Sequence, residues 1–357
     1  MLIRYSSIVH LRNAVFLLQG GDDGCTCNDP LDPISHAELP GWIKTHKMNM
    51  AQIDKVVQAQ KVIDVAFLGD SITEEWNGRW VGKNNPSLTP IKKTFDKYFT
   101  REGGGDYEGV ALGIAGDQAP HVLWRLKHGE IPDSFKPRVW WLLAGINDLT
   151  NGGCSPEVVL LGILRIVEEI QYWKPDAIIV INSILPTAVP AIKRDKNFKR
   201  GFNPKNENGP KAKGNTQKKG KHNDGVDENA VEDPEETQKP KNKFVRGFTQ
   251  VKDLGPTIKI INKQLKKFSE KHSNIQYFEA EDIFITTNQR GKTVINTKLM
   301  NGVHPTPEGH KEWAKKIVKK LEGLIDKQKS LPASEDPPAA QTSKGANDVD
   351  DDEDDAY

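Results

Sequence analysis

Four short blocks of this sequence carry the residue types that acyl transfer requires. Ser71 ends a Gly-Asp-Ser triplet, Gly113 lies in Leu-Gly-Ile-Ala-Gly-Asp, Asn147 in Gly-Ile-Asn-Asp, and His304 precedes a proline. Acyl transfer needs a nucleophile, a general base and hydrogen-bond donors that face the developing oxyanion. We expect Ser71 to attack an ester carbonyl. His304 would take the serine proton and pass it to the leaving alcohol. The N–H groups of Ser71 and Gly113 and the side-chain amide of Asn147 would hold the oxyanion.

Each block alone also has a plain structural interpretation. A Gly-Asp-Ser triplet occurs in ordinary turns, and serine is a residue type that often caps a helix. Glycines, and the proline after His304, are equally common in turns and at the ends of elements. The joint appearance of the four blocks in this order has no such interpretation and favours catalysis.

The elements that must position these residues are visible as apolar runs. The clearest runs cover residues 62–68, 139–144 and 177–185. They lack polar alternation, which is typical of strands in a parallel sheet covered on both faces. A further strand is expected over 275–278, and helices are expected over 156–172, 256–271 and 307–324. This order predicts a three-layer α/β/α flavodoxin-like sandwich with a parallel sheet, and Ser71 and Asn147 fall where its strands end.

The chain divides by composition into one domain and its appendages. We expect an N-terminal extension over 1–49, a domain over 50–328 and an acidic tail over 329–357. An insertion over 192–243 interrupts the domain, because its apolar residues are too few to bury a core. The insertion follows the third strand and should emerge near the active-site rim. Deletion of 195–240 should preserve folding and change substrate access.

Charge and cysteine content exclude several classes of function. A formal net charge of +1 gives no field that would attract nucleic acid or an anionic membrane. No apolar run is long enough for a transmembrane helix. The three cysteines are odd in number, and Cys25 and Cys27 are too close for the usual zinc spacing. We therefore expect no disulfide framework, no metal site and no cofactor.

Compartment and assembly stay open at this point. Residues 1–20 form either a weak signal or transit sequence or a plain lead-in, and we favour the lead-in. The cytoplasm is then favoured over secretion or an organelle. The expected partner is a small-molecule ester, either a lipid or an acetylated sugar, and a homodimer stays open.

The four blocks resemble the SGNH (GDSL) hydrolases, whose marker residues match Ser71, Gly113, Asn147 and His304. Within that superfamily the chain is most similar to the catalytic subunits of intracellular platelet-activating-factor acetylhydrolases. The similarity rests on residues 113–117, on His-Val-Leu-Trp-Arg-Leu over 121–126 and on the Gly-Glu pair that follows. It covers about residues 62–324 without the insertion. The resemblance implies the SGNH fold and a serine esterase for a short acyl group such as acetyl; a carbohydrate O-acetyl esterase is the alternative.

One position departs from that family. The family has an aspartate three residues before the catalytic histidine, and this chain has Asn301. Four hypotheses follow: a Ser-His dyad in which Asn301 accepts from His304, a carboxylate borrowed from elsewhere, a binding protein without activity, and deamidation of Asn301 before Gly302 to aspartate. We favour a weakened esterase, because all four marker residues are retained.

Several other residues have structural interpretations. Asp70 and Asp148 are expected to form hydrogen bonds that hold the active-site turns. We expect His310 to lie on the surface of the last helix rather than to bind a metal. Three tryptophans, at positions 76, 80 and 124, suit either the core or the wall of an acyl pocket.

Overall fold

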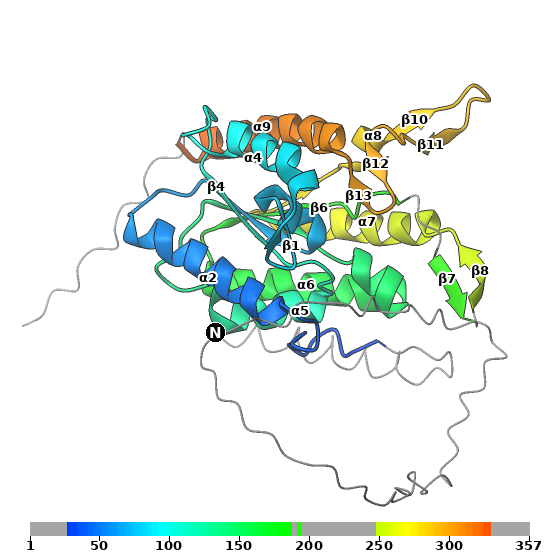
Figure 1. The fold of residues 1–357 in the computed structure, drawn as a ribbon, viewed down its shortest axis with the longest axis horizontal. Helices are drawn as coiled ribbons and strands as arrows, with labels where there is room; N and C mark the ends of the chain where they lie inside the picture. Colours follow the sequence, from blue (N-terminus) through cyan, green and yellow to red (C-terminus); the bar gives the residue numbers. More distant parts are fainter. Residues whose placement is uncertain (1–26, 188–190, 195–247, 330–357) are drawn as a thin grey trace, which may run out of the picture.

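The computed structural model describes residues 27–187, 191–194 and 248–329. A five-stranded parallel sheet forms its centre, with strand order β4-β1-β5-β6-β9 (Figure 1). This order is that of flavodoxin-like folds, so the predicted fold class is confirmed. The sheet strands are β1 (Val65–Gly69), β4 (Gly109–Gly113), β5 (Val139–Leu143), β6 (Ile178–Asn182) and β9 (Ile275–Phe278).

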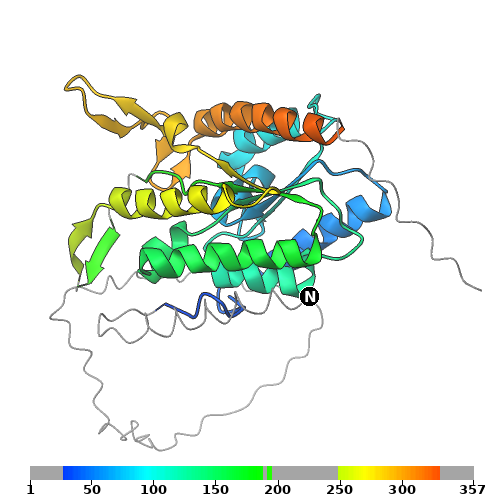
Figure 2. The same ribbon diagram turned by 180° about the vertical axis from the view of Figure 1, so that it is seen from behind.

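Helices cover both faces of the sheet. Helices α4 and α9 pack together on one face, and α5, α6 and α7 lie on the other (Figures 1 and 2). Helix α2 runs along the edge strand β4. The helices are α2 (Trp42–Gln58), α3 (Ser71–Glu74), α4 (Thr89–Phe99), α5 (Ala119–Arg125), α6 (Pro156–Trp173), α7 (Gly255–Ser269), α8 (Glu281–Phe284) and α9 (Pro307–Lys329). The short turns are η1 (Glu75–Asn77), η2 (Pro86–Leu88), η3 (Leu126–Glu130) and η4 (Asp148–Gly152).

Among the described residues, four small antiparallel pairs lie outside the central sheet. The first three are β2 (Arg79–Trp80) with β3 (Lys83–Asn84), β7 (Ala191–Arg194) with β8 (Phe248–Lys252), and β10 (Ile285–Thr287) with β11 (Thr293–Ile295). The fourth joins β12 (Met300–Asn301) to β13 (His304–Pro305) and carries the predicted base.

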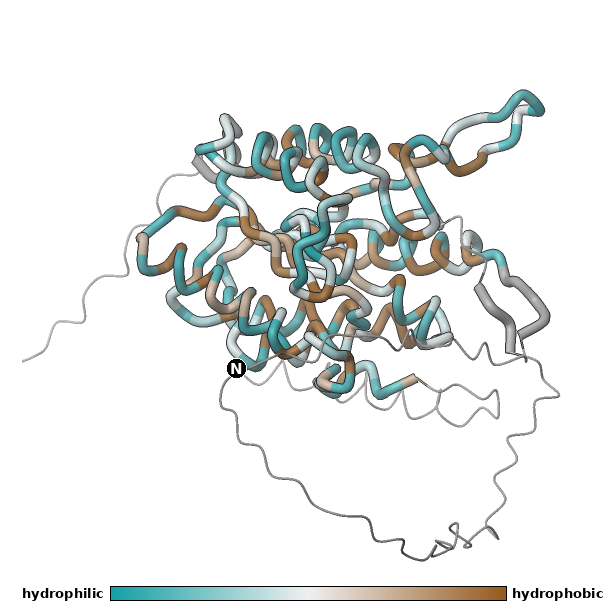
Figure 3. The backbone as a smooth tube through the Cα atoms, viewed as in Figure 1, coloured by the Kyte–Doolittle hydropathy of each residue, from teal (hydrophilic) through white to brown (hydrophobic). Residues whose placement is uncertain are grey.

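Apolar sequence explains the sheet. Every residue of β1, β4 and β5 is buried, and Figure 3 shows the hydrophobic segments gathered in the central strands and the helix sides that face them. Helix α6 begins where the sequence predicts, because Ser155 accepts the N–H of Val158 and a proline follows it. Strand β4 was not predicted. It begins and ends with glycine, so its apolar run is too short to stand out.

The predicted segment boundaries meet the structure in two ways. The expected domain start at residue 50 falls within α2, which continues the packed part of the chain toward the N-terminus. Most of the insertion and nearly all of the acidic tail lie outside the described residues. Thr187, the last described residue before the gap at 188–190, donates a hydrogen bond to the carbonyl of Gly302 at 3.3 Å. That end of the loop therefore lies beside the β12–β13 hairpin. Within the described part of the chain, no helix has the length and apolarity of a membrane span.

One expectation about the cysteines is wrong. Cys27 and Cys154 form a disulfide, with their Cα atoms 5.6 Å apart. The two residues are 127 positions apart, and the fold brings Cys154, just after η4, against the segment that precedes α2. Local spacing considers only neighbouring cysteines, so it could not reveal this pair.

Candidate active site

Ser71 lies at the sharp turn between β1 and α3. A side chain at Gly69 would place Cβ 2.3 Å from the carbonyl oxygen of Leu143, so only glycine fits there. Asp70 accepts the backbone N–H of Ile72 at 3.0 Å and caps α3. Asp70 thus holds the turn, as expected from the sequence, and Ser71 is fixed at the carboxyl end of the strand.

The structure brings Ser71 and His304 together across 233 positions of sequence. Ser71 Oγ and His304 Nε2 are 2.8 Å apart, within hydrogen-bonding distance. Burial lowers the pKa of His304 below its ordinary value. Its imidazole is therefore neutral near pH 7, the form in which Nε2 can accept the serine proton. The indole ring of Trp80, which is 41% exposed, lies edge-on to this imidazole with ring centroids 5.4 Å apart.

Gly113 lies directly against the serine turn. Its strand pairs with β1, and Gly113 stands opposite Gly69. A Cβ at Gly113 would lie 2.2 Å from the backbone nitrogen of Glu74 and 2.5 Å from the carbonyl oxygen of Asp70. No other residue type fits without moving this backbone. The Gly113 backbone therefore packs directly against the turn that carries Ser71.

Asn147 follows β5, whose end stands beside the end of β1. Its Nδ2 donates to the carbonyl of Asp117 at 2.9 Å, and its Oδ1 accepts from Asn151 at 3.1 Å. These bonds fix the orientation of the carboxamide and leave one N–H available for a ligand. Asp148 accepts the N–H of Ala119 at 3.1 Å and so holds the neighbouring turn, as expected.

A buried arginine that sequence reasoning missed connects these turns. Arg125 is fully buried and donates to the carbonyl of Gly69 at 2.7 Å and to that of Leu112 at 3.2 Å. Its guanidinium also pairs with Asp117 at 2.8 Å and with Glu130. Arg125 thus holds the strand ends that precede Ser71 and Gly113. An arginine inside an otherwise apolar helical block was the only signal in the sequence.

Glu74 was also missed, and it joins the same two turns from the other side. Its carboxyl group is fully buried and accepts the N–H groups of Ala115 at 2.8 Å, Val81 at 3.0 Å and Gly82 at 2.7 Å. The loop after Gly113 is therefore bound to the helix that begins with Ser71.

Asn301 stands opposite His304 in the β12–β13 hairpin. Directly paired residues of an antiparallel hairpin present their side chains on the same side. Asn301 is exposed, however, and its carboxamide forms no hydrogen bond within the described residues. Among the described residues, no carboxylate forms a hydrogen bond or an ion pair with His304.

The expectation for His310 is wrong, because this residue is fully buried. Its Nδ1 lies 3.2 Å from the carbonyl of Thr306, and its ring packs edge-on to Trp76 with centroids 4.6 Å apart. Its Nε2 is 3.6 Å from a carboxyl oxygen of Glu75, too far for a hydrogen bond. Burial lowers the pKa of His310 to about 4 and raises that of Glu75 to about 8, so both are neutral at pH 7. The apolar spacing of α9 carried the signal, since His310 shares a face with the buried residues Trp313, Ala314, Ile317 and Leu321.

One cluster has the composition of a metal site but not its chemistry. Ligand atoms of His36, Asp117 and His121 lie within 4.8 Å of one another. Asp117 already accepts from Trp42 Nε1 at 2.6 Å and pairs with Arg125. Nδ1 of His121 accepts a backbone N–H, which leaves the proton on Nε2 and removes that lone pair from coordination. These residues do not fit a resident metal ion.

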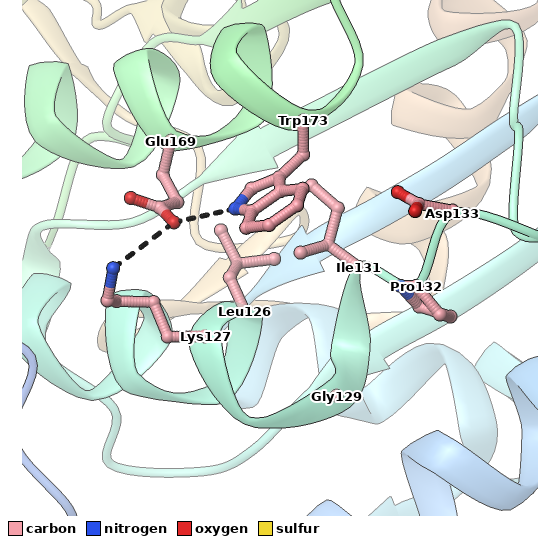
Figure 4. A pocket seen from close by; sticks show the side chains of 8 residues that line it. All are labelled: Leu126, Lys127, Gly129, Ile131, Pro132, Asp133, Glu169 and Trp173. Carbon is pink, nitrogen blue, oxygen red and sulfur yellow. Dashed lines mark hydrogen bonds and ion pairs between the residues drawn. The ribbon is translucent and has the colours of Figure 1, made fainter. Parts of the chain in front are cut away.

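A cavity of about 320 Å³ lies away from the serine (Figure 4). It opens near the amino end of β5, at the edge of the sheet opposite the carboxyl-end edge where Ser71 lies. Glu169 on its wall accepts from Trp173 Nε1 at 2.9 Å and pairs with Lys127, so its carboxylate is already engaged by neighbouring side chains. We assign this cavity no part in the chemistry.

Comparison with known proteins adds a family match and several relatives. A sequence model of the GDSL-like lipase/acylhydrolase family matches residues 67–312. The chain is 33% identical over 147 residues to the platelet-activating factor acetylhydrolase IB subunit beta homolog of Drosophila melanogaster, covering 39% of this chain and 53% of that protein. It is 41% identical over 89 residues to the human alpha2 subunit, covering 25% and 37%. The chain thus spans about half or less of the length of these relatives.

The chain also aligns with solved structures, at lower sequence identity. A GDSL-like lipase from Bacteroides thetaiotaomicron is 18% identical, with a TM-score of 0.47, and the match covers 79% of this chain and 98% of that one. A family 3 carbohydrate esterase from Talaromyces cellulolyticus is 15% identical, with a TM-score of 0.39 over 74% and 99%.

Proposed function

We propose that this chain, which belongs to the GDSL-like lipase/acylhydrolase family, is a serine esterase that uses Ser71 as nucleophile and His304 as general base. The observation that carries the proposal is the 2.8 Å approach of Ser71 Oγ to His304 Nε2. The lowered pKa of His304 supports it, since a neutral imidazole is the form that can take a proton.

The reaction proceeds through an acyl-enzyme. His304 takes the hydroxyl proton while Ser71 Oγ attacks the ester carbonyl, and the protonated imidazole then gives that proton to the leaving alcohol. Water attacks the acyl-enzyme with His304 again as base, releasing the acid and restoring Ser71. The N–H groups of Ser71 and Gly113 and the free N–H of Asn147 stabilise both tetrahedral intermediates. The two hydrogen bonds that fix the Asn147 amide support this role, because a preorganised donor needs no reorientation during reaction.

The proposed substrate is an ester of a short acyl group, such as acetate. The similarity to proteins named acetylhydrolases supports this size. The exposed indole of Trp80 beside His304 offers an apolar wall next to the reacting serine. Acetate release from acetylated xylan, with none from aryl acetates or phospholipid, would instead favour a carbohydrate O-acetyl esterase.

Hydrolysis of p-nitrophenyl acetate by the wild type, Ser71→Ala and His304→Ala tests the proposal. Each substitution should lower turnover by about a thousandfold or more while circular dichroism shows an unchanged fold. Labelling by a fluorophosphonate probe should disappear in Ser71→Ala. A wild type that is no faster than Ser71→Ala and resists the probe would instead indicate a binding protein on a hydrolase scaffold.

A further inference from the structure

The side chain of Asn301, opposite the proposed base, forms no hydrogen bond with any residue that the structure describes. In the β12–β13 hairpin, Asn301 pairs directly with His304, so the two side chains share one side of the hairpin. Paired side chains of this kind have Cβ atoms about 4.5–5.5 Å apart, which is within reach of a hydrogen bond between their ends. Within the described residues, His304 has Ser71 as its one side-chain hydrogen-bond partner.

The surroundings of Asn301 favour a chemical change at its side chain. Asn301 is exposed and its carboxamide is held by no hydrogen bond within the described chain. Gly302 follows it in the turn with φ of 66° and has no side chain to shield its own nitrogen. The Gly302 nitrogen can therefore approach Cγ of Asn301.

The reaction at this pair needs only water. The backbone nitrogen of Gly302 attacks Cγ of Asn301, a new N–Cγ bond forms, and the Cγ–Nδ2 bond breaks with loss of ammonia. The proton of the Gly302 N–H leaves with the ammonia. Water then opens the five-membered succinimide at either carbonyl and gives aspartate or isoaspartate. The net change is the gain of one water and the loss of one ammonia.

We propose that Asn301-Gly302 is a modification site at which deamidation to aspartate supplies the third member of a Ser-His-Asp triad, an inference that rests on the proposed esterase function. Aspartate at 301 would accept the Nδ1–H of His304, fix the tautomer in which Nε2 faces Ser71, and stabilise the imidazolium. In the serine protease that is the usual template for this triad, replacing the aspartate by asparagine lowers turnover by about ten-thousandfold. The unmodified chain is therefore the weak form of the enzyme. Isoaspartate does not activate it, because the extra backbone methylene displaces the carboxylate.

Ageing of the purified full-length chain in warm, mildly alkaline buffer tests the proposal. Peptide mass spectrometry measures the fractions of Asn, Asp and isoAsp at 301, and p-nitrophenyl acetate hydrolysis is followed in the same samples. Activity should rise in proportion to the Asp fraction. Asn301→Asp should begin at least about tenfold more active than fresh wild type and gain nothing on ageing. Asn301→Gln, whose longer side chain disfavours the cyclic intermediate, should also gain nothing.

The outcomes separate this proposal from the esterase itself. The deamidation proposal is overturned if aged, fully active wild type retains Asn301, or if Asn301→Asp is no faster than fresh wild type while Ser71→Ala is inactive. If the wild type is no faster than Ser71→Ala, the proposed function fails instead. In Asn301→Asp, an increase in the pKa that defines the acid limb of the pH–rate profile would show that the carboxylate contacts His304. A nearby carboxylate stabilises the imidazolium and so raises the pKa of the histidine.

Discussion

Ser71 Oγ and His304 Nε2 lie 2.8 Å apart, but different kinds of contact hold the two residues in place. On the nucleophile side, the fully buried Arg125 holds the strand ends before Ser71 and Gly113, and the carboxyl group of Glu74 holds the loop after Gly113. On the base side, His304 lies in a hairpin of two-residue strands opposite an exposed Asn301. Beneath it, His310 and Glu75 are neutral and too far apart for a hydrogen bond.

This difference shows how the two halves of the site can change independently. The proposed nucleophile and oxyanion donors lie on three turns that follow three strands. Buried polar networks fix such turns, because a broken bond leaves an unsatisfied buried group. The base needs one orientation of one ring, which a short hairpin and local packing can provide. We therefore expect a substitution at the exposed position 301 to change activity more than the stability of the fold.

The largest expected effect comes from breaking the nucleophile side at Arg125. Arg125→Met keeps an apolar stem but removes the guanidinium and leaves Asp117 and Glu130 buried without their cation, so the free energy of unfolding should fall by about 3–5 kcal/mol. Arg138→Met is the matched control, because Arg138 is 41% exposed and its partner Asp64 also pairs with Arg101. The control should lose less than about 1 kcal/mol in urea titration. Equal losses would show that the buried network is not what holds these turns.

Asn147→Ala tests the oxyanion donor on the same side. Loss of one preorganised donor should lower kcat about 100- to 1000-fold with little change in KM, because the donor acts mainly in the transition state. Asn151→Ala removes only the hydrogen bond to Asn147 Oδ1 and should reduce kcat by less than about tenfold. An unchanged kcat in Asn147→Ala would remove this residue from the mechanism.

The disulfide joins the turn after η4 to the segment before α2, on the nucleophile side of the site. Replacing both Cys27 and Cys154 by serine should lower the free energy of unfolding by about 2–4 kcal/mol, since the bond closes a long loop in the unfolded chain. Wild type treated with a reductant should lose the same amount. Cys25→Ser should have no effect. A melting temperature that is unchanged by the reductant would show that the bond does not form in solution.

Sequence alone predicted the fold and the four family blocks well, for a physical reason. Continuous apolar runs report burial on both faces, and β5, β6 and β9 appear in the structure within a few residues of their predicted bounds. Family membership, inferred from Ser71, Gly113, Asn147 and His304, is confirmed by the family match. The catalytic roles of these residues, and that of Asn301, stay predictions.

The features that sequence missed depend on contacts between distant parts of the chain. The Cys27–Cys154 pair, the bonds from Arg125 to two strand ends and the burial of His310 all arise from how helices pack on the sheet. Sequence reasoning places a polar helix residue on the surface by default. The burial of His310 follows only when it is seen to share a helix face with apolar residues.

The smallest effect is expected beneath the base, at Glu75. Burial raises its folded pKa to about 8 from an ordinary 4.5, so the folded protein keeps a proton that the unfolded chain has lost. The stabilisation present below pH 4.5 is therefore lost as the pH rises toward 8. Glu75→Gln has no proton to lose, so its stability relative to wild type should rise progressively across this window and stay level outside it.

Thermal unfolding of both proteins from pH 4 to pH 9, in steps of about one unit, measures this difference. Glu308→Gln, at an exposed position on α9, is the control and should show a flat difference. A flat difference for Glu75→Gln as well would mean that Glu75 is ionised in the fold. The Glu75 carboxylate would then lie 3.6 Å from His310 Nε2 as a buried charge, and the base side would contain buried charge as the nucleophile side does.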